Sequence, residues 1–219
     1  MAFYRLFSGD PILIIPWITA LVLSITIHEF AHGFAAFKLG DNTAEMSGRL
    51  TLNPLAHLDP LGTIMLFLVG FGWAKPVPIN PYLIQKGRLG SAIVSFAGIG
   101  MNLLFAISSV LGLHILLSVI GLDPTNVAVR FLAFIVFINI GLFIFNLVPI
   151  APLDGYRIFE SIAPFSFRRI APFFETWGFV ILIAVVFFTN IISYLITFAI
   201  YIFSITSGLD LLSLAFGGL

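Results

Sequence analysis

The chain has 219 residues, of which 60% are hydrophobic and only 9% are charged, and its ten basic residues balance its ten acidic residues. Soluble domains carry about 25% charged residues, so this composition excludes an ordinary soluble protein and indicates an integral membrane protein. The sequence has no block of basic residues to suggest nucleic-acid binding. It has no cysteine, which excludes disulfides and thiolate metal sites.

Pro11–Lys38 is the first long apolar segment. It is long enough to span a bilayer as a tilted helix. We expect it to be retained, because it is too long for the core of a signal peptide and no cleavage site of small residues follows it. Gly40-Asp41-Asn42 is expected to end this helix. The alternating residues Arg49–Leu52 in the polar segment that follows predict a short strand.

The next two segments predict a re-entrant element. Leu61–Phe71 is apolar but too short to span a bilayer, so we expect it to enter the membrane and return. In Trp73–Pro81, here called the arm, three prolines alternate with other residues, which favours extended backbone over helix. We therefore predict that the arm belongs to a small membrane-embedded β-hairpin. Such backbone is tolerated at membrane depth only against protein or a water-filled cavity.

The rest of the chain predicts four more spanning helices and one amphipathic helix at the membrane interface, Tyr156–Ile170. The four spanning helices are expected at Gly90–Ile120, Val127–Leu147, Pro172–Thr189 and Ile191–Leu214. The predicted fold is an all-α polytopic membrane protein with about five to six transmembrane helices, a re-entrant segment and the small β-hairpin. No repeat or linker divides the chain, so residues 1–219 are expected to form one membrane domain.

The basic residues provide a test of topology. If Leu61–Phe71 is re-entrant and the other five segments span, only Arg5 and Arg130 fall on one side of the membrane. The remaining eight fall on the other side, which the positive-inside rule makes cytoplasmic: Lys38, Arg49, Lys75, Lys86, Arg88, Arg157, Arg168 and Arg169. His28, His32 and Asp154 then share the cytoplasmic half.

The first helix contains the motif His28-Glu29-Phe30-Ala31-His32. Residues four apart share a helix face, so both imidazoles can bind one metal ion, and Glu29 lies close enough to reach a water molecule there. Each charged side chain in a spanning helix costs about 2.5–3.5 kcal/mol on insertion scales. The motif therefore indicates a functional site.

A catalytic zinc ion usually takes three protein ligands and leaves a fourth position for water. His57, His114 and Asp154 are the candidates for the third ligand. His114 lies toward the opposite side of the membrane, and His57 lies in a polar loop, where a structural hydrogen bond is the default expectation. Asp154 follows a proline-broken helix end at membrane depth, where an unpaired carboxylate needs a cation. We therefore prefer Asp154 and keep His57 as a secondary candidate.

These groups suit peptide hydrolysis. Zinc can activate water and polarise a carbonyl group, and Glu29 can act as general base. Asn146, eight residues before Asp154, is the best-placed amide to stabilise an oxyanion. The arm offers an edge to which a substrate strand can add, through residues Trp73, Lys75, Pro76, Val77 and Pro78. Gly98 and Asn102 indicate close helix packing with a polar tie.

The pairing of His28-Glu29-x-x-His32 with Asn146-x-x-Pro149-x-x-Pro152-Leu153-Asp154-Gly155 resembles the site-2 protease family of intramembrane zinc metalloproteases, peptidase family M50. The resemblance extends from about residue 11 to 162. It implies one Zn²⁺ per chain bound by His28, His32 and Asp154, with Glu29 as catalytic base and Asn146 as a substrate or oxyanion contact. It also implies a re-entrant hairpin and cleavage of transmembrane substrates within the bilayer.

The resemblance also bears on domain organisation. Residues 11–162 would form the catalytic core and residues 172–214 accessory helices, in a minimal member without a PDZ-like or CBS-like domain. Relatives often carry an Ala-Gly-Pro-x-x-Asn run in the next helix, but residues 97–102 lack the proline. The resemblance therefore assigns Asn102 no role beyond packing, and Asn102 stays a secondary candidate.

The expected location is a prokaryotic cell membrane, with the active site toward the cytoplasmic half. The expected partners are the lipid bilayer and transmembrane protein or peptide substrates, with no nucleic acid, and the oligomeric state stays open. Two alternatives remain: a metal transporter that uses the same ligands transiently, and a non-catalytic relative that binds membrane helices. The apolar outer half of helix Pro11–Lys38 argues against a transporter, which needs a polar path on both sides. An intact Glu29 argues against a non-catalytic relative.

Overall fold

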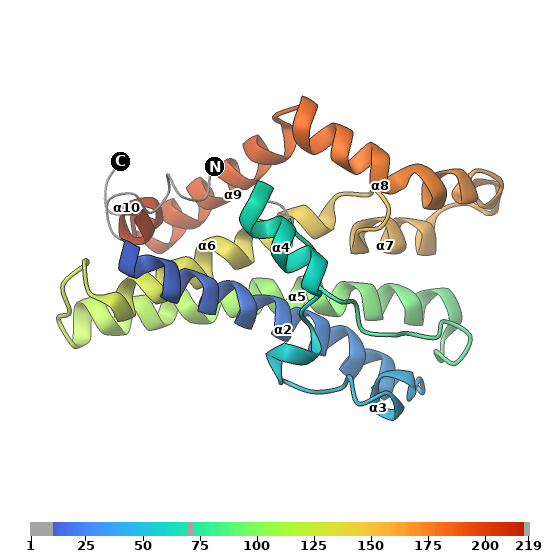
Figure 1. The fold of residues 1–219 in the computed structure, drawn as a ribbon, viewed down its shortest axis with the longest axis horizontal. Coiled ribbons are helices and arrows are strands. Elements are labelled where there is room, and N and C mark those ends of the chain that lie inside the picture. The colour runs from blue at the N-terminus through green and yellow to red at the C-terminus, as the bar shows by residue number, and fades with distance from the viewer. Residues whose placement is uncertain (1–10, 70–71, 217–219) are drawn as a thin grey trace.

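The structure is a computed structural model that describes residues 11–69 and 72–216 (Figure 1). The described residues are mostly helical, as predicted. In chain order the helices are η1 Pro11–Leu13, α2 Ile14–Lys38, α3 Thr43–Met46, η2 Pro54–Ala56, α4 Pro60–Val69, α5 Gly87–His114, η3 Ile115–Val119, α6 Val127–Leu147, α7 Asp154–Ile162, η4 Phe165–Arg169, α8 Ala171–Phe188, α9 Ile191–Ser207 and α10 Leu211–Phe216.

Four of the described helical segments are long and apolar enough to cross a bilayer, which makes the chain a multi-pass membrane protein. They are Pro11–Lys38, Gly87–Val119, Val127–Leu147 and Ala171–Phe188. The predicted fifth helix, Ile191–Leu214, is broken at Gly208, which has a φ of 68° and ends α9 after 17 residues. At 1.5 Å per residue α9 is about 25 Å long, slightly less than the apolar thickness of a bilayer.

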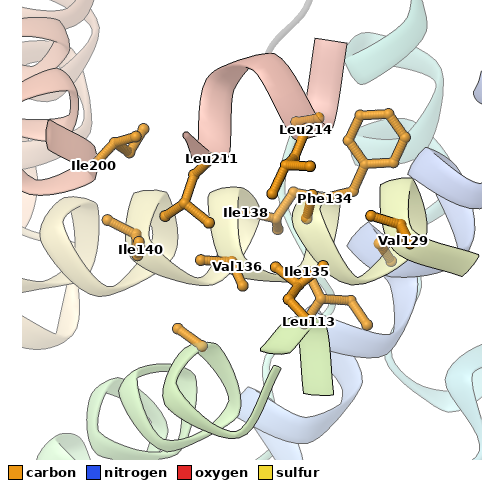
Figure 2. Close-up of a cluster of buried hydrophobic side chains, with 14 of the residues drawn as sticks. Leu113, Val129, Phe134, Ile135, Val136, Ile138, Ile140, Ile200, Leu211 and Leu214 are labelled. Atoms are coloured by element: carbon orange, nitrogen blue, oxygen red, sulfur yellow. The ribbon is translucent and has the colours of Figure 1, made fainter. Parts of the chain in front are cut away.

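Helices α2, α5 and α6 lie side by side and form the centre of the molecule (Figure 1). The main apolar cluster surrounds α6, where Phe134 and Val136 are fully buried, and Leu113 of α5 packs against it. Leu211 and Leu214 of α10 cover α6 from the other side (Figure 2). Because α6 is enclosed by other helices, it is apolar on all faces rather than amphipathic.

A polar contact inside this apolar core connects α2 to α6. Asn139 donates hydrogen bonds from Nδ2 to Ser24 Oγ at 2.7 Å and to the Ile135 carbonyl at 2.8 Å. Both Asn139 and Ser24 are fully buried. Hydrogen bonds of this kind stabilise helix pairs in lipid, where burial of apolar surface alone does not drive association. This contact lies one turn before His28 on α2.

Helix α4 has 10 residues and a length of about 15 Å, half of the apolar thickness of a bilayer. It is therefore too short to cross the membrane alone. Residues 70–71 of the predicted re-entrant segment lie outside the described residues. The chain returns directly against α4, because a Cβ at Gly62 would lie only 2.2 Å from the Trp73 carbonyl oxygen.

The predicted β-hairpin is not supported. Within residues 11–69 and 72–216, the arm makes only an isolated bridge, between Ala74 and Leu58, and no strand ladder. Pro76 and Pro78 cannot donate to a ladder, and side chains bind the arm instead. The predicted strand at 49–52 is also wrong, since the amides of Arg49 and Leu50 both donate to the Ala44 carbonyl and bend the chain there.

The predicted interfacial helix Tyr156–Ile170 is two elements. Helix α7 begins at Asp154 and ends at Ile162, and η4 follows after Pro164. Helix α7 packs against α5. The Arg88 guanidinium at the start of α5 donates to the Glu160 and Ala163 carbonyls at the end of α7, each at 2.6 Å. A cation at a helix C-terminus is favourable, and this contact holds α7 alongside α5.

Candidate metal centre

Helix α2 carries His28 and His32 one turn apart on its buried side. Their Nε2 atoms lie 3.0 Å apart. The two rings meet edge to face, with centroids 4.5 Å apart and planes at 88°. Two imidazole nitrogens thus point at one position, as the four-residue spacing predicts.

Asp154 reaches the same position from the first residue of α7. Its Oδ2 lies 3.0 Å from His32 Nε2 and 3.2 Å from His28 Nε2. Gly155, the next residue, allows this placement because it has no side chain. A Cβ there would lie 2.4 Å from the Leu147 carbonyl oxygen, which is too close. The start of α7 therefore packs directly on the end of α6, and this contact turns Asp154 toward α2.

Helix α5 closes the centre at Gly98. A Cβ at this position would lie 2.4 Å from His32 Nε2 and 2.8 Å from His28 Cε1. Real Cβ atoms do not make such contacts, so any side chain here would occupy the space in front of the histidine nitrogens. Glycine leaves that space free.

The outer nitrogen of each histidine has an oxygen partner on α5. The Nδ1 atom of His28 lies 2.8 Å from Asn102 Oδ1, and that of His32 lies 2.8 Å from the Val94 carbonyl oxygen. A carbonyl oxygen only accepts, so a neutral His32 carries its proton on Nδ1 and has its lone pair on Nε2. Sequence reasoning favoured packing for Asn102 and kept it as a secondary site candidate, and it missed Val94, whose contribution is a backbone atom.

The electrostatics of the centre suit a cation. A carboxylate oxygen carries only lone pairs toward its neighbours, and so does a histidine Nε2 whose proton lies on Nδ1. Oδ2 of Asp154 lies within 3.2 Å of both Nε2 atoms. One ligand atom from each of the three residues lies within 4.8 Å of the other two. Convergent lone pairs in a buried site need a positive charge among them, so this donor set fits a metal ion.

Glu29 lies beside this group and is bound to the arm. Its Oε2 accepts a hydrogen bond from the Val77 amide at 2.9 Å. Val77 is buried, and its Cγ1 would lie 3.1 Å from a Cβ at Gly33 on α2. The arm thus packs against the turn of α2 that follows the candidate ligands His28 and His32, and the predicted base and the predicted substrate segment are in direct contact.

Two further side chains hold the arm. The Arg49 guanidinium donates to the Lys75 and Pro76 carbonyls at 2.8 and 3.2 Å. The fully buried Asp41 carboxylate accepts from the Asn80 amide at 2.7 Å. Sequence reasoning missed both contacts, because nothing local marks a loop carboxylate as a partner for a segment 39 residues away.

The other predicted site residues hydrogen-bond carbonyl groups outside the centre or lie in the arm. The Asn146 Nδ2 donates to the Leu142 carbonyl of its own helix at 3.0 Å. The fully buried His57 bonds the Thr51 carbonyl through Nε2 at 2.8 Å, which is the structural role expected by default. His114 bonds the Ser207 carbonyl at 2.9 Å and ties α5 to α9. Trp73 lies at the start of the arm, about two-fifths exposed.

A His-His-Asp group with a neighbouring glutamate, formed where the membrane-length helix α2 meets the start of α7, defines the chain as a membrane protein of the metal-dependent hydrolase class. The model of the family described as "Peptidase family M50" matches residues 16–189. The chain belongs to this family and is a metalloprotease.

Curated relatives support the same assignment. The chain is 40% identical over 191 residues to a Bacillus subtilis protein named "Putative zinc metalloprotease YwhC", covering 85% of this chain and 86% of the relative. It is 32% identical over 176 residues to "Putative zinc metalloprotease Rip2" of Mycolicibacterium smegmatis, covering 76% of this chain and 64% of the relative. The Mycobacterium tuberculosis Rip2 is 31% identical over 163 residues, covering 71% of this chain and 60% of the relative. No solved structure matches the chain at comparable significance.

Proposed function

We propose that this chain is a zinc-dependent intramembrane endopeptidase, which hydrolyses peptide bonds of transmembrane proteins or peptides within the bilayer. The observation that carries the proposal is the convergence of His28, His32 and Asp154 on one position, inside a helix bundle of membrane-spanning length. A hydrolytic site so enclosed is reached most readily by a substrate that is itself in the membrane.

His28, His32 and Asp154 would hold one Zn²⁺ through the two Nε2 atoms and a carboxylate oxygen. Two imidazoles and one carboxylate form an established ligand set for catalytic zinc, and they leave a fourth position open. When bound, zinc supplies Lewis acidity, which polarises a carbonyl group and lowers the pKa of water to about 7. Gly98 supports this assignment, because its missing side chain leaves space at the Nε2 atoms.

Glu29 would act as general base and then as general acid. Its carboxylate takes a proton from the attacking water molecule and delivers it to the nitrogen of the leaving amine. Its hydrogen bond to the Val77 amide holds one oxygen in place and leaves the other oxygen to exchange the proton. Asn146 would stabilise the oxyanion with its amide, for which Nδ2 must turn from the Leu142 carbonyl toward the substrate.

The arm would bind the substrate as an added strand. The hydrogen bond from the Val77 amide to Glu29 supports a substrate position beside the base. The Val77 carbonyl and both backbone groups of Ile79 make no hydrogen bond with any described residue. These unpaired groups offer an edge for an extended substrate segment beside Glu29.

The remaining parts of the proposal concern location. Residues 11–162 would form the catalytic core and residues 172–214 the accessory helices, in a prokaryotic cell membrane. The excess of lysine and arginine on one side would make that side cytoplasmic and would place the metal centre in the cytoplasmic half.

The test is cleavage of a labelled transmembrane peptide in liposomes that contain the purified chain and zinc. We expect cleavage by the wild type and by Glu45→Gln, an exposed control on α3, and at least about a 100-fold slower rate for Glu29→Gln. Glutamine can keep the contact with Val77 but cannot take the proton. Cleavage that persists in Glu29→Gln refutes the assignment of the base. Zinc uptake into the vesicles without any cleavage identifies a transporter, and peptide binding without cleavage identifies a non-catalytic relative.

A further inference from the structure

Asn102 lies on α5 one turn after Gly98, and it is 1% exposed. Its Oδ1 lies 2.8 Å from His28 Nδ1, and its Nδ2 is buried with no hydrogen-bond partner among the described residues. The side chain thus makes one strong polar contact, which is with a residue of the candidate metal centre.

The contact determines which nitrogen of His28 is available. Neutral imidazole carries one N–H donor and one lone pair, on different nitrogens. An acceptor at Nδ1 places the proton there and leaves the lone pair on Nε2, the atom that points at His32 and Asp154. If Nδ1 had no acceptor, the proton could sit on Nε2 and block it as a ligand.

We propose that Asn102 is a positioning residue, whose Oδ1 keeps the proton of His28 on Nδ1 and presents the Nε2 lone pair to the metal. The inference rests on the proposed function, since it assumes that His28 is a ligand. The Val94 carbonyl does the same for His32 from about two turns earlier on the same face of α5. Helix α5 therefore sets the tautomer and the ring angle of both histidines.

Packing alone does not account for this asparagine. Gly98 already permits the close approach of α5 to α2. An apolar side chain of similar size at position 102 would fill the same space without burying an unpaired N–H group. The contact of Oδ1 with His28 therefore explains why an amide side chain occupies position 102.

The experiment compares zinc affinities of the full chain in detergent, after removal of metal and by competition with a chromophoric chelator. Asn102→Leu removes the acceptor, and we expect it to weaken zinc binding about 10- to 100-fold. Asn102→Asp restores an oxygen acceptor and should bind zinc nearly as well as the wild type. Asn139→Leu is the matched control. It also removes a buried asparagine from the three-helix core, but this asparagine contacts Ser24 instead of a histidine.

The outcomes separate the possibilities. Weak binding by Asn102→Leu together with tight binding by Asn102→Asp and Asn139→Leu supports the positioning role. Equal affinity of Asn102→Leu and the wild type overturns it, as does equal weakening by the leucine and aspartate variants. If Asn102→Leu does not fold, Asn102→Ala provides the same comparison with a small cavity. Failure of the wild type to bind zinc overturns the proposed function as well, whereas the other failures leave that function standing.

Discussion

The approach of α5 to the metal centre at Gly98 allows a sharp test with one added methyl group. A Cβ at position 98 would lie 2.4 Å from His32 Nε2 and 2.6 Å from His32 Cε1. Ordinary Cβ contacts begin at 3.4 Å. The His32 ring, or α5 itself, must therefore move by about 1 Å, the difference between 3.4 and 2.4 Å, in a bundle with few voids to absorb the shift.

A shift of that size exceeds what a metal site tolerates. Ligand distances in such sites vary by about 0.2 Å, so a displacement of 1 Å removes His32 from the coordination sphere. Loss of a supporting hydrogen bond weakens metal binding about 10- to 100-fold. Displacement of a ligand should do more, and we expect Gly98→Ala to lower zinc affinity by at least about 100-fold.

The assay is zinc affinity by chelator competition, with thermal unfolding as the check that the variant folds. Gly100→Ala is the control, because a Cβ there would meet only the ring of Phe96 on its own helix, at 3.3 Å. Zinc affinity of Gly98→Ala equal to that of the wild type and of Gly100→Ala would refute the geometry described for this centre.

Three further predictions concern the arm and α7. Val77→Pro removes the amide that binds Glu29, whereas Val77→Ala keeps it. We expect kcat to fall about tenfold more in the proline variant, at unchanged zinc content. Equal kcat values for the two variants would contradict a role for this contact. Gly155→Ala would bring a Cβ within 2.4 Å of a carbonyl at the end of α6 and push the start of α7, with Asp154, away. We therefore expect metal analysis to show loss of zinc, and full zinc occupancy would argue against this packing. Asp41→Ala leaves the Asn80 amide unpaired and should lower the free energy of unfolding by about 1–3 kcal/mol in a denaturant titration, and no change would exclude the anchor.

Sequence alone predicted the parts of the fold that depend on local properties. Helix α6 begins and ends at Val127 and Leu147 as predicted, and the first helical segment covers residues 11–38, because length and apolar composition identify spanning helices. The approach of His28 to His32 follows from helix periodicity. The partnership with Asp154, 122 residues away, was predicted because an unpaired carboxylate at membrane depth needs a cation.

The errors and omissions concern contacts between distant segments. The predicted hairpin required a partner strand, but the alternation of prolines in the arm cannot show that Arg49 and Asp41 side chains replace a strand. The break at Gly208 was missed because an isolated glycine in an apolar run is common in membrane helices. The contact of Gly98 with the histidines depends on the exact rotation of α5 relative to α2, which no local pattern determines.

The central claim is that one metal ion lies among His28, His32 and Asp154. The most direct measurement is an anomalous difference map at the zinc edge from crystals of the zinc-bound protein. We predict one peak per chain, about 2.0–2.2 Å from both Nε2 atoms and from an Asp154 carboxylate oxygen. A peak at His57 or elsewhere, or a zinc ion that does not contact Asp154, would contradict the account.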